Sequence, residues 1–304
     1  MDKPKIGLFL MSSRGLAVLE ALVREHGPEA IAYVVTASDQ SVRKDYQAEL
    51  TAAARQAGLL SFTREHLPAR LPRVAARFAA GWRWLLPENE HEPIVVFHDS
   101  LLPRYRGFAP LVNALINAEP KLGVTALLGA KHYDAGPILA QEAIAVNYPL
   151  RLAEAIEAIR PCYAKLATAV LGDLRKGTWA PRVQDETQAS YSLWRDEDDY
   201  VINWSQDAAT IRRQVDATGF PYRGASVLAR GRKLRVLAAS ERPDVRIEIR
   251  TPGKIIFMEE GKPVVVCQSG LLRLEELVED ATGVSALPWP HFRTRFGAGS
   301  PEPA

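Results

Sequence analysis

Short apolar runs alternate with amphipathic segments through the first part of the chain, and this alternation leaves few folds open. The runs Lys5–Met11 and Ala30–Thr36 have the length and composition of buried strands, and helical patterns follow them at Gly15–His26 and Tyr46–Gly58. Strands that alternate with helices pair in one parallel sheet with helices packed on its faces. The sequence therefore predicts an α/β fold with a doubly wound, Rossmann-like, mostly parallel sheet.

The same alternation continues to about residue 190. Further apolar runs and helical patterns follow at Phe78–Trp82, Ile94–Phe97, Ala109–Ala118, Gly123–Leu128 and Leu152–Arg175. The last of these is typical of one long helix with an Ala/Leu face. We therefore expect residues 1–190 to form the first, catalytic domain.

Beyond residue 190 the pattern changes. We expect residues 191–204 to be a linker, after which a helix at Asp207–Ala217 precedes several short β-type runs between Gly, Pro and charged turns. Such a series predicts a small, OB-like β-barrel over residues 205–290. Residues 291–304 are expected to be an unordered tail, because the end of the chain lacks an apolar period.

The composition is that of an ordinary globular protein, and its charges nearly balance. A net charge of +2 gives no field that would hold a polyanion, so a nucleic-acid partner would need a local basic patch. The two cysteines, Cys162 and Cys267, are expected to be buried and reduced, and the scattered histidines give no metal motif. No apolar run approaches the roughly 18 residues of a membrane span, so we expect a cytoplasmic protein without membrane contact.

Two polar positions follow apolar strands and are candidates for chemistry. His98 ends the run Ile94–Phe97 and begins a loop rich in Pro and Gly, and Asp134 lies in a tight loop beside Gly136. In open parallel sheets the ligand crevice lies at the carboxyl ends of the strands. A histidine at a strand end is more often structural than catalytic, however, and an aspartate in a loop often forms an Asx turn.

Two longer motifs begin at these polar residues. His98 begins H-D-S-L-L-P-R-Y-R-G, and Asp134, 36 residues later, begins D-A-G-P-I. Both motifs, in this order and at this interval, resemble those of the 10-formyltetrahydrofolate-dependent formyltransferases. The resemblance continues through Tyr191–Trp204 and Gly219–Ala225, so it covers nearly the whole chain. It implies an N-formyltransferase that uses 10-formyltetrahydrofolate as formyl donor.

The resemblance also implies roles for the two polar residues. In that family the histidine stabilises the oxyanion of a tetrahedral intermediate, and the aspartate orients the histidine and helps to remove a proton from the attacking amine. The family's asparagine two residues before the histidine is Val96 here. Valine cannot donate a hydrogen bond, and one lost oxyanion donor costs about 2.7–4 kcal/mol. Ser100, a backbone N–H near Gly136 or a water could replace it.

The resemblance further implies where the donor and acceptor bind. The donor would contact the following residues: Gly81, Trp82, Arg83, Trp84, Leu85, His132, Tyr133 and Gly136. The acceptor would contact the loop residues Arg104, Tyr105, Arg106 and Gly107. Aromatic walls suit a flat pterin and paired arginine donors suit a phosphate or carboxylate, but the tryptophans could equally be core and the arginines solvated.

Three hypotheses about the function stay open. The sequences of the motifs D-A-G-P-I and P-Y-R-G-A favour a nucleotide-linked amino sugar or a secondary-metabolite amine as acceptor. A methionyl-tRNA acceptor has less support, because the stretch Thr36–Glu49 contains few basic residues that could bind RNA. The basic strand Arg230–Arg235 nevertheless leaves this hypothesis open. The third hypothesis is a catalytically weak homologue that only binds folate or a metabolite. A homo-oligomer also remains open.

Overall fold

The computed structural model describes residues 3–87 and 91–297, which form two compact units. The first unit contains the described residues of 1–111, 120–146 and 154–193, and the second those of 112–119, 147–153 and 194–297. The sequence led us to expect contiguous domains, whereas two short stretches, 112–119 and 147–153, group with the second unit. Each unit is described by itself below.

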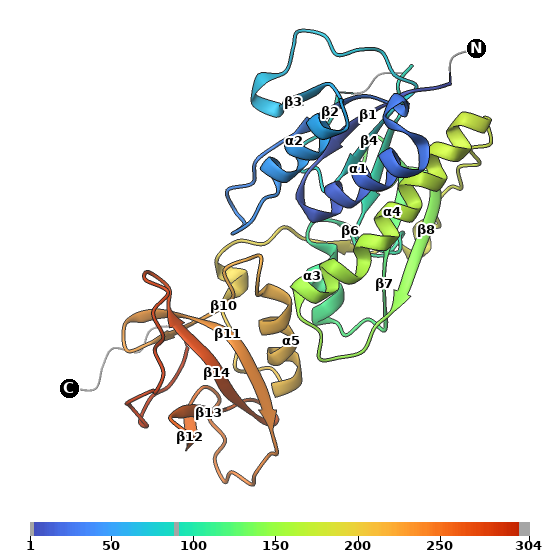
Figure 1. The fold of residues 1–304 in the computed structure, drawn as a ribbon. Coiled ribbons are helices and arrows are strands. Elements are labelled where there is room, and N and C mark those ends of the chain that lie inside the picture. The colour runs from blue at the N-terminus through green and yellow to red at the C-terminus, as the bar shows by residue number, and fades with distance from the viewer. Residues whose placement is uncertain (1–2, 88–90, 298–304) are drawn as a thin grey trace. The chain divides into compact units, whose positions relative to one another are not determined.

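A seven-stranded sheet forms the centre of the first unit (Figure 1). In spatial order its strands are β3 (Ser61–Thr63), β2 (Ile31–Thr36), β1 (Ile6–Leu10), β4 (Ala76–Ala80), β5 (Ile94–His98), β7 (Lys121–Leu128) and β8 (Ile138–Ala145). The strands from β3 to β5 pair in parallel, whereas β7 is antiparallel to both β5 and β8. The predicted mostly parallel, Rossmann-like sheet is therefore confirmed.

Three helices flank this sheet, namely α1 (Ser12–His26), α2 (Gln47–Gln56) and α4 (Leu152–Lys176). Helix α3 (Pro110–Ile116) begins in the first unit, and its larger part belongs to the second. Helices α1 and α4 run side by side (Figure 1), and the His26 imidazole bonds the Thr168 carbonyl oxygen between them. Every residue of β1 and β4 is buried, which explains why their sequences are apolar throughout.

Two short strands lie outside the large sheet. Strand β6 (Arg106–Gly107) pairs in parallel with β9 (Tyr191–Ser192), and the pair joins the loop after His98 to the end of the first unit. Residues 191–193 of the expected linker therefore belong to the first unit.

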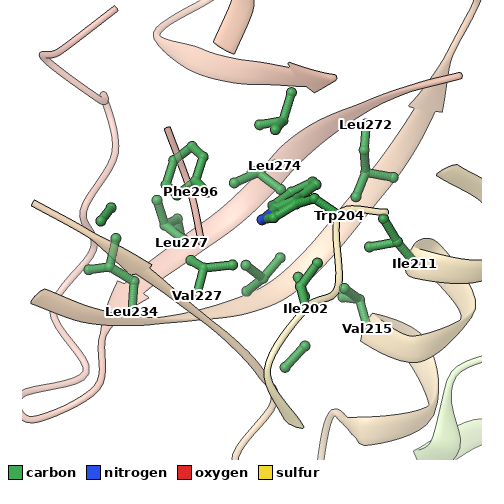
Figure 2. Packing of buried hydrophobic residues seen from close by; sticks show 14 of the residues in the cluster. Ile202, Trp204, Ile211, Val215, Val227, Leu234, Leu272, Leu274, Leu277 and Phe296 are labelled. Atoms are coloured by element: carbon green, nitrogen blue, oxygen red, sulfur yellow. The ribbon is translucent and has the colours of Figure 1, made fainter. Parts of the chain in front are cut away.

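The second unit contains a five-stranded antiparallel sheet and one main helix. In spatial order the strands are β10 (Ala225–Ala229), β11 (Arg232–Arg242), β14 (Leu271–Glu279), β13 (Lys262–Val266) and β12 (Ile255–Glu259), and the helix is α5 (Ala208–Thr218). Figure 2 shows its core, in which Trp204, Leu274 and Phe296 are buried. The small antiparallel β domain expected from the sequence is confirmed.

The expectation of an unordered tail from residue 291 is wrong for residues 291–297. Phe296 is 1% exposed and its ring lies 5.5 Å from that of Trp289. Phe296 N–H donates to the Gly253 carbonyl beside β12, and Gly297 N–H donates to the Leu228 carbonyl of β10. The buried Phe296 ring and these backbone hydrogen bonds together hold this segment across the two edge strands. Residues 298–304 lie outside the described residues.

Two further sequence expectations concern the cysteines and membrane spans. Both Cys162 and Cys267 are buried free thiols, and burial raises the pKa of the Cys267 thiol to about 12. Within the described part of the chain, no helix has both the length and the apolar character to cross a membrane.

Replacing Phe296 with Ala tests its role as the anchor of the tail. We expect the substitution to lower the free energy of unfolding by about 3–5 kcal/mol, because it empties a buried aromatic site. Phe292, which is 53% exposed, provides the matched control, and Phe292→Ala should change stability by no more than about 0.5 kcal/mol. Urea denaturation measures both, and equal effects of the two substitutions would show that residue 296 anchors nothing.

Candidate active site

The two sequence motifs meet at the end of β5. His98 Nδ1 lies 3.5 Å from Asp134 Oδ1, which is an ion-pair distance longer than a normal hydrogen bond. The side chains are 8% and 13% exposed, respectively, so the pair is largely shielded from water but retains access to the surface. A carboxylate and an imidazole in such surroundings interact more strongly than they would in solvent.

Each ring nitrogen of His98 faces an oxygen atom of the protein. Nε2 lies 2.8 Å from the carbonyl oxygen of Tyr105, and Nδ1 faces Asp134. A carbonyl can only accept, so Nε2 carries a hydrogen in this arrangement. His98 Nε2 could therefore donate to a substrate oxygen only if that oxygen displaced the Tyr105 carbonyl oxygen as the acceptor.

The backbone around this pair is strained. Tyr105 has φ 61° and Asp134 has φ 54°, both in the left-handed region that non-glycine residues rarely adopt. Asp134 Oδ2 accepts a 2.8 Å hydrogen bond from the N–H of Gly107, whose φ is 99°. The aspartate side chain therefore joins its own loop to the loop after His98, and local strain of this kind clusters at functional sites.

A polar row across the sheet fixes the chain just after His98. Thr125 of β7 lies opposite His98, and Gln141 of β8 lies opposite Thr125. The Thr125 hydroxyl donates to the Ser100 carbonyl at 2.6 Å, and the Gln141 amide donates to Thr125 Oγ1 and to the Leu102 carbonyl. Neither side chain was predicted from the sequence, because antiparallel pairing brings both to the site from distant positions.

Ser100 is less suited to the role that the sequence suggested for it. Its side chain is buried, and its hydroxyl donates at 2.8 Å to the Arg104 carbonyl. A hydroxyl has only one hydrogen to donate. In this arrangement the Ser100 hydroxyl uses it within its own loop and is not available as a donor to an oxyanion.

Val96 lies in an apolar row beside the polar one. It pairs with Leu127 of β7 and packs against the cluster of Leu102, Leu127 and Ile138. His98 and Val96 lie on the same face of β5, since alternate strand residues share a face. The position of the family's asparagine amide is therefore filled by aliphatic side chains.

The structure corrects the acceptor role of Arg106. Its side chain is 0% exposed, and the guanidinium bonds both carboxylate oxygens of Glu186 and the Gln184 amide oxygen. The hydrogen bond from Arg106 lowers the pKa of the Glu186 carboxyl. Because the Arg106 guanidinium is buried, its N–H groups are not accessible to a phosphate of the acceptor. Arg104, in contrast, is exposed and lies beside the ring of Tyr105.

Gln184 extends this network to the aspartate loop. Its amide nitrogen donates at 2.7 Å to the carbonyl oxygens of Asp134 and Gly136. No local sequence signal marks Gln184, which lies about 50 residues away along the chain. A Cβ at Gly136 would come 1.7 Å from the Leu128 carbonyl, so this glycine permits close packing of the protein's own backbone, where we had expected approach of a ligand.

The expected donor segment lies just after β4. Gly81 has φ 66°, and Trp82 packs edge-on against Phe9 in the core while its indole N–H is buried without a partner among the described residues. The ring of Trp84 contacts that of Trp82. Trp82 is thus partly a core residue, and its unpaired N–H leaves one donor for a ligand or a water.

The remaining residues expected to bind the donor differ in their surroundings. Arg83 donates to Asp39 and Ser41, and Leu85 is almost fully exposed. His132 and Tyr133 are exposed in the aspartate loop. The aromatic contacts recorded for Tyr133 are with Phe108 and Tyr191, which are acceptor-loop and β9 residues.

A second buried network lies beside the site and was not predicted. Asp99, the residue after His98, accepts hydrogen bonds from Arg14 of α1 and Tyr163 of α4. Burial, together with the Asp99 charge, raises the pKa of Tyr163 well above its ordinary value. These bonds tie the end of β5 to two helices. Within 3–87 and 91–297, no cluster of three His, Cys, Asp or Glu side chains suits a metal ion.

Comparison with known proteins assigns the chain to a family. Residues 11–160 match the family "Formyl transferase", and residues 195–289 match "Formyl transferase, C-terminal domain". The chain belongs to the formyl transferase family. The matched regions contain every strand of the large sheet except β1, and all strands of the antiparallel sheet of the second unit.

Relatives of this chain include a methionyl-tRNA formyltransferase of Roseiflexus sp. (strain RS-1). It is 33% identical over 199 residues, which cover 66% of this chain and 60% of the relative. Two related methionyl-tRNA formyltransferases are likewise matched over 62% of their own length. The alignment thus spans about three fifths of the length of these relatives.

Solved structures share the fold at low sequence identity. An N-formyltransferase from Helicobacter canadensis, in complex with folinic acid and dTDP-3-aminofucose, superposes with a TM-score of 0.66 at 16% identity and covers 89% of this chain and 98% of its own. HypX from Aquifex aeolicus, in complex with tetrahydrofolic acid, gives a TM-score of 0.60 at 17% identity over 91% of this chain and 44% of its own.

Arg106→Ala should separate a structural arginine from a ligand-binding one. We expect it to lower the free energy of unfolding by about 2–3 kcal/mol, because the Gln184 amide oxygen loses its buried partner. Arg104→Ala, which changes an exposed arginine two residues earlier, should stay within about 0.5 kcal/mol. Chemical denaturation in the absence of ligand measures both, and an unchanged stability in Arg106→Ala would contradict the structural role.

Val96→Asn tests whether the valine site is apolar. We expect a loss of about 1–3 kcal/mol in the free energy of unfolding, because the amide enters an aliphatic cluster without a partner. Val183, which is 88% exposed in the same unit, gives the control Val183→Asn, with an expected change within about 0.5 kcal/mol. If thermal or urea denaturation finds Val96→Asn as stable as the parent chain, the site holds a polar partner for the amide.

Proposed function

We propose that this protein is an N-formyltransferase that moves the formyl group of 10-formyltetrahydrofolate to a primary amine of a small acceptor. The acceptor favoured is a nucleotide-linked amino sugar or a secondary-metabolite amine. The observation that carries the proposal is the contact of His98 with Asp134 at the end of β5, within the motifs of the formyl transferase family. A positioned acid and base is what proton transfer near neutral pH requires.

The chemistry follows from these two side chains. The amine nitrogen attacks the formyl carbon, and the C–N10 bond of the donor breaks as the tetrahedral intermediate collapses. Asp134 Oδ1 accepts the proton that the amine loses, and N10 of the departing tetrahydrofolate takes up a proton. His98 donates from Nε2 to the oxyanion once the Tyr105 carbonyl is displaced. The products are the N-formyl amine and tetrahydrofolate.

Two observations support a folate donor. The proteins of similar fold include structures with folinic acid and with tetrahydrofolic acid. In this chain, the rings of Trp82 and Trp84 contact one another in the segment after β4, and the Trp82 indole N–H has no partner among the described residues. A flat heterocycle with polar edges can use both a ring contact and a hydrogen-bond donor.

The charge distribution favours a small acceptor over an RNA. On the basic strand of the second unit, Arg232 pairs with Glu279, and Lys233 pairs with Glu197 at 2.8 Å. Partial burial works to raise the pKa of Glu197, but hydrogen bonds from Lys233 and Arg235 outweigh it and lower that pKa. Basic side chains already neutralised by carboxylates attract phosphates weakly.

A methionyl-tRNA acceptor is the second candidate, because relatives that are 33% and 34% identical to this chain carry that name. In the stretch Thr36–Glu49, which would correspond to an RNA-binding insertion, Lys44 pairs with Glu49. Asp39 there pairs with Arg83. The local charges therefore cancel within the protein, and the small-amine acceptor keeps the stronger support.

Formyl transfer to a panel of acceptors tests the proposal directly. The protein is incubated with 10-formyltetrahydrofolate and either nucleotide-linked amino sugars or methionyl-tRNA, and mass spectrometry follows the formylated product. We expect formylation of an amino sugar, and roughly 10²- to 10⁴-fold slower transfer in Asp134→Asn because the base is lost. Asp173→Asn, a change at an exposed residue of α4, should leave the rate unaltered.

Other outcomes discriminate among the hypotheses. If methionyl-tRNA alone were formylated, the acceptor would be methionyl-tRNA and the proposal of a small acceptor would be wrong. Thermal stabilisation by 5-formyltetrahydrofolate without transfer to any acceptor would indicate a homologue that binds folate but does not turn it over. Absence of both binding and transfer would contradict the proposed function as a whole.

A further inference from the structure

Three exposed aromatic rings contact one another beside the His98–Asp134 pair. Phe108, Tyr133 and Tyr191 are 52%, 54% and 59% exposed, respectively. The ring centroids of Phe108 and Tyr133 lie 6.0 Å apart, and those of Tyr133 and Tyr191 lie 6.2 Å apart. We call these three residues the aromatic platform.

The platform is fixed by the residues that build the site. Phe108 N–H donates to the Ser192 carbonyl of β9, and a Cβ at Gly107 would lie 3.3 Å from the Tyr133 ring. The buried Arg106 guanidinium lies 5.9 Å from the centre of the Tyr191 ring. The rings are therefore held on an ordered surface before any ligand binds, which reduces the entropy lost on binding.

Part of each platform side chain remains accessible to a ligand, since about half of its surface is exposed. Adjacent rings are tilted by 52° and 86°, so no pair of platform rings stacks face to face. A contiguous exposed aromatic surface is uncommon on a protein that binds nothing there, and such patches mark recognition sites. Tyr133 directly precedes Asp134 in the chain, which places this surface beside the candidate base.

Two cationic side chains belong to the loops of the platform. Arg104 and Lys131 are exposed in the two loops that carry Phe108 and Tyr133. The exposed carboxylate of Glu186 is paired with Arg106. Aromatic faces next to cationic side chains suit a ligand that combines a flat ring with negative charge.

We propose that the aromatic platform of Phe108, Tyr133 and Tyr191 binds the base of a nucleotide that carries the acceptor amine. The inference deepens the proposed function and depends on it for the presence of the amine. The base stacks on a platform ring, while Arg104 and Lys131 attract the phosphate groups. Tyr133 and Arg104 thus contribute to the acceptor site, and Tyr133 is reassigned from the donor site.

Calorimetric titration of the full chain with mononucleotides tests the platform without any need for turnover. The probes are the four ribonucleoside 5′-monophosphates and thymidine 5′-monophosphate, with ribose 5-phosphate as the ligand that lacks a base. We expect at least one nucleotide to bind, and ribose 5-phosphate to bind roughly 10-fold more weakly or worse, since stacking supplies most of the affinity.

Substitutions assign the binding to the platform. Phe108→Ala and Tyr133→Ala should each weaken nucleotide binding roughly 10-fold. Phe292→Ala removes an equally exposed phenylalanine from the second unit and should leave the affinity unchanged. Tyr133→Leu preserves apolar volume without the aromatic face, so it should behave like Tyr133→Ala.

The contradicting results are distinct from failure of the proposed function. Equal binding of ribose 5-phosphate, unchanged affinity in the platform variants, or binding of tRNA without any mononucleotide would overturn the platform proposal. A fall in oligomeric state in Phe108→Ala, with unchanged nucleotide affinity, would instead make the platform a subunit contact. Stabilisation by 5-formyltetrahydrofolate is measured in parallel in every variant, and its absence in the parent chain would count against the formyl transfer itself.

Discussion

The buried guanidinium of Arg106 is the interaction on which the arrangement of the site depends. It joins the loop after β5 to Gln184 and Glu186, which lie about 80 residues further along the chain. Gln184 in turn holds the carbonyl oxygens of Asp134 and Gly136. The planar guanidinium group of an arginine has five N–H donors in a fixed geometry, so it can bind several acceptors that converge on it. A lysine ammonium group could not do the same. The distance between imidazole and carboxylate is thus fixed by a network behind them.

The fold was largely predictable because its signals are local. Buried parallel strands need continuous apolar runs, and the helices that cover them need a periodic apolar face, so both are visible in short windows of sequence. The end of the chain was not predictable in this way. One aromatic side chain, Phe296, anchors residues 291–297, and a single residue creates no period that a sequence window could detect.

The candidate site was predictable only in part. The histidine and the aspartate follow strands and belong to recognisable motifs, and the structure brings them together. The motif could not show that Arg106 points inward, because an arginine in a Gly- and Pro-rich loop is as compatible with solvent or ligand as with the core. Thr125 and Gln141 were missed because antiparallel register, which motifs do not encode, aligns them with His98.

Formyl transfer by the proposed mechanism requires that His98 and Asp134 act as one unit on the transferred proton and the developing oxyanion. The most direct measurement is a double-mutant cycle on the single-turnover rate of formyl transfer, with His98→Gln, Asp134→Asn and the double variant. If the two side chains act together, the double variant will be little slower than the slower single variant. Losses that multiply would show two independent contributions and contradict the account.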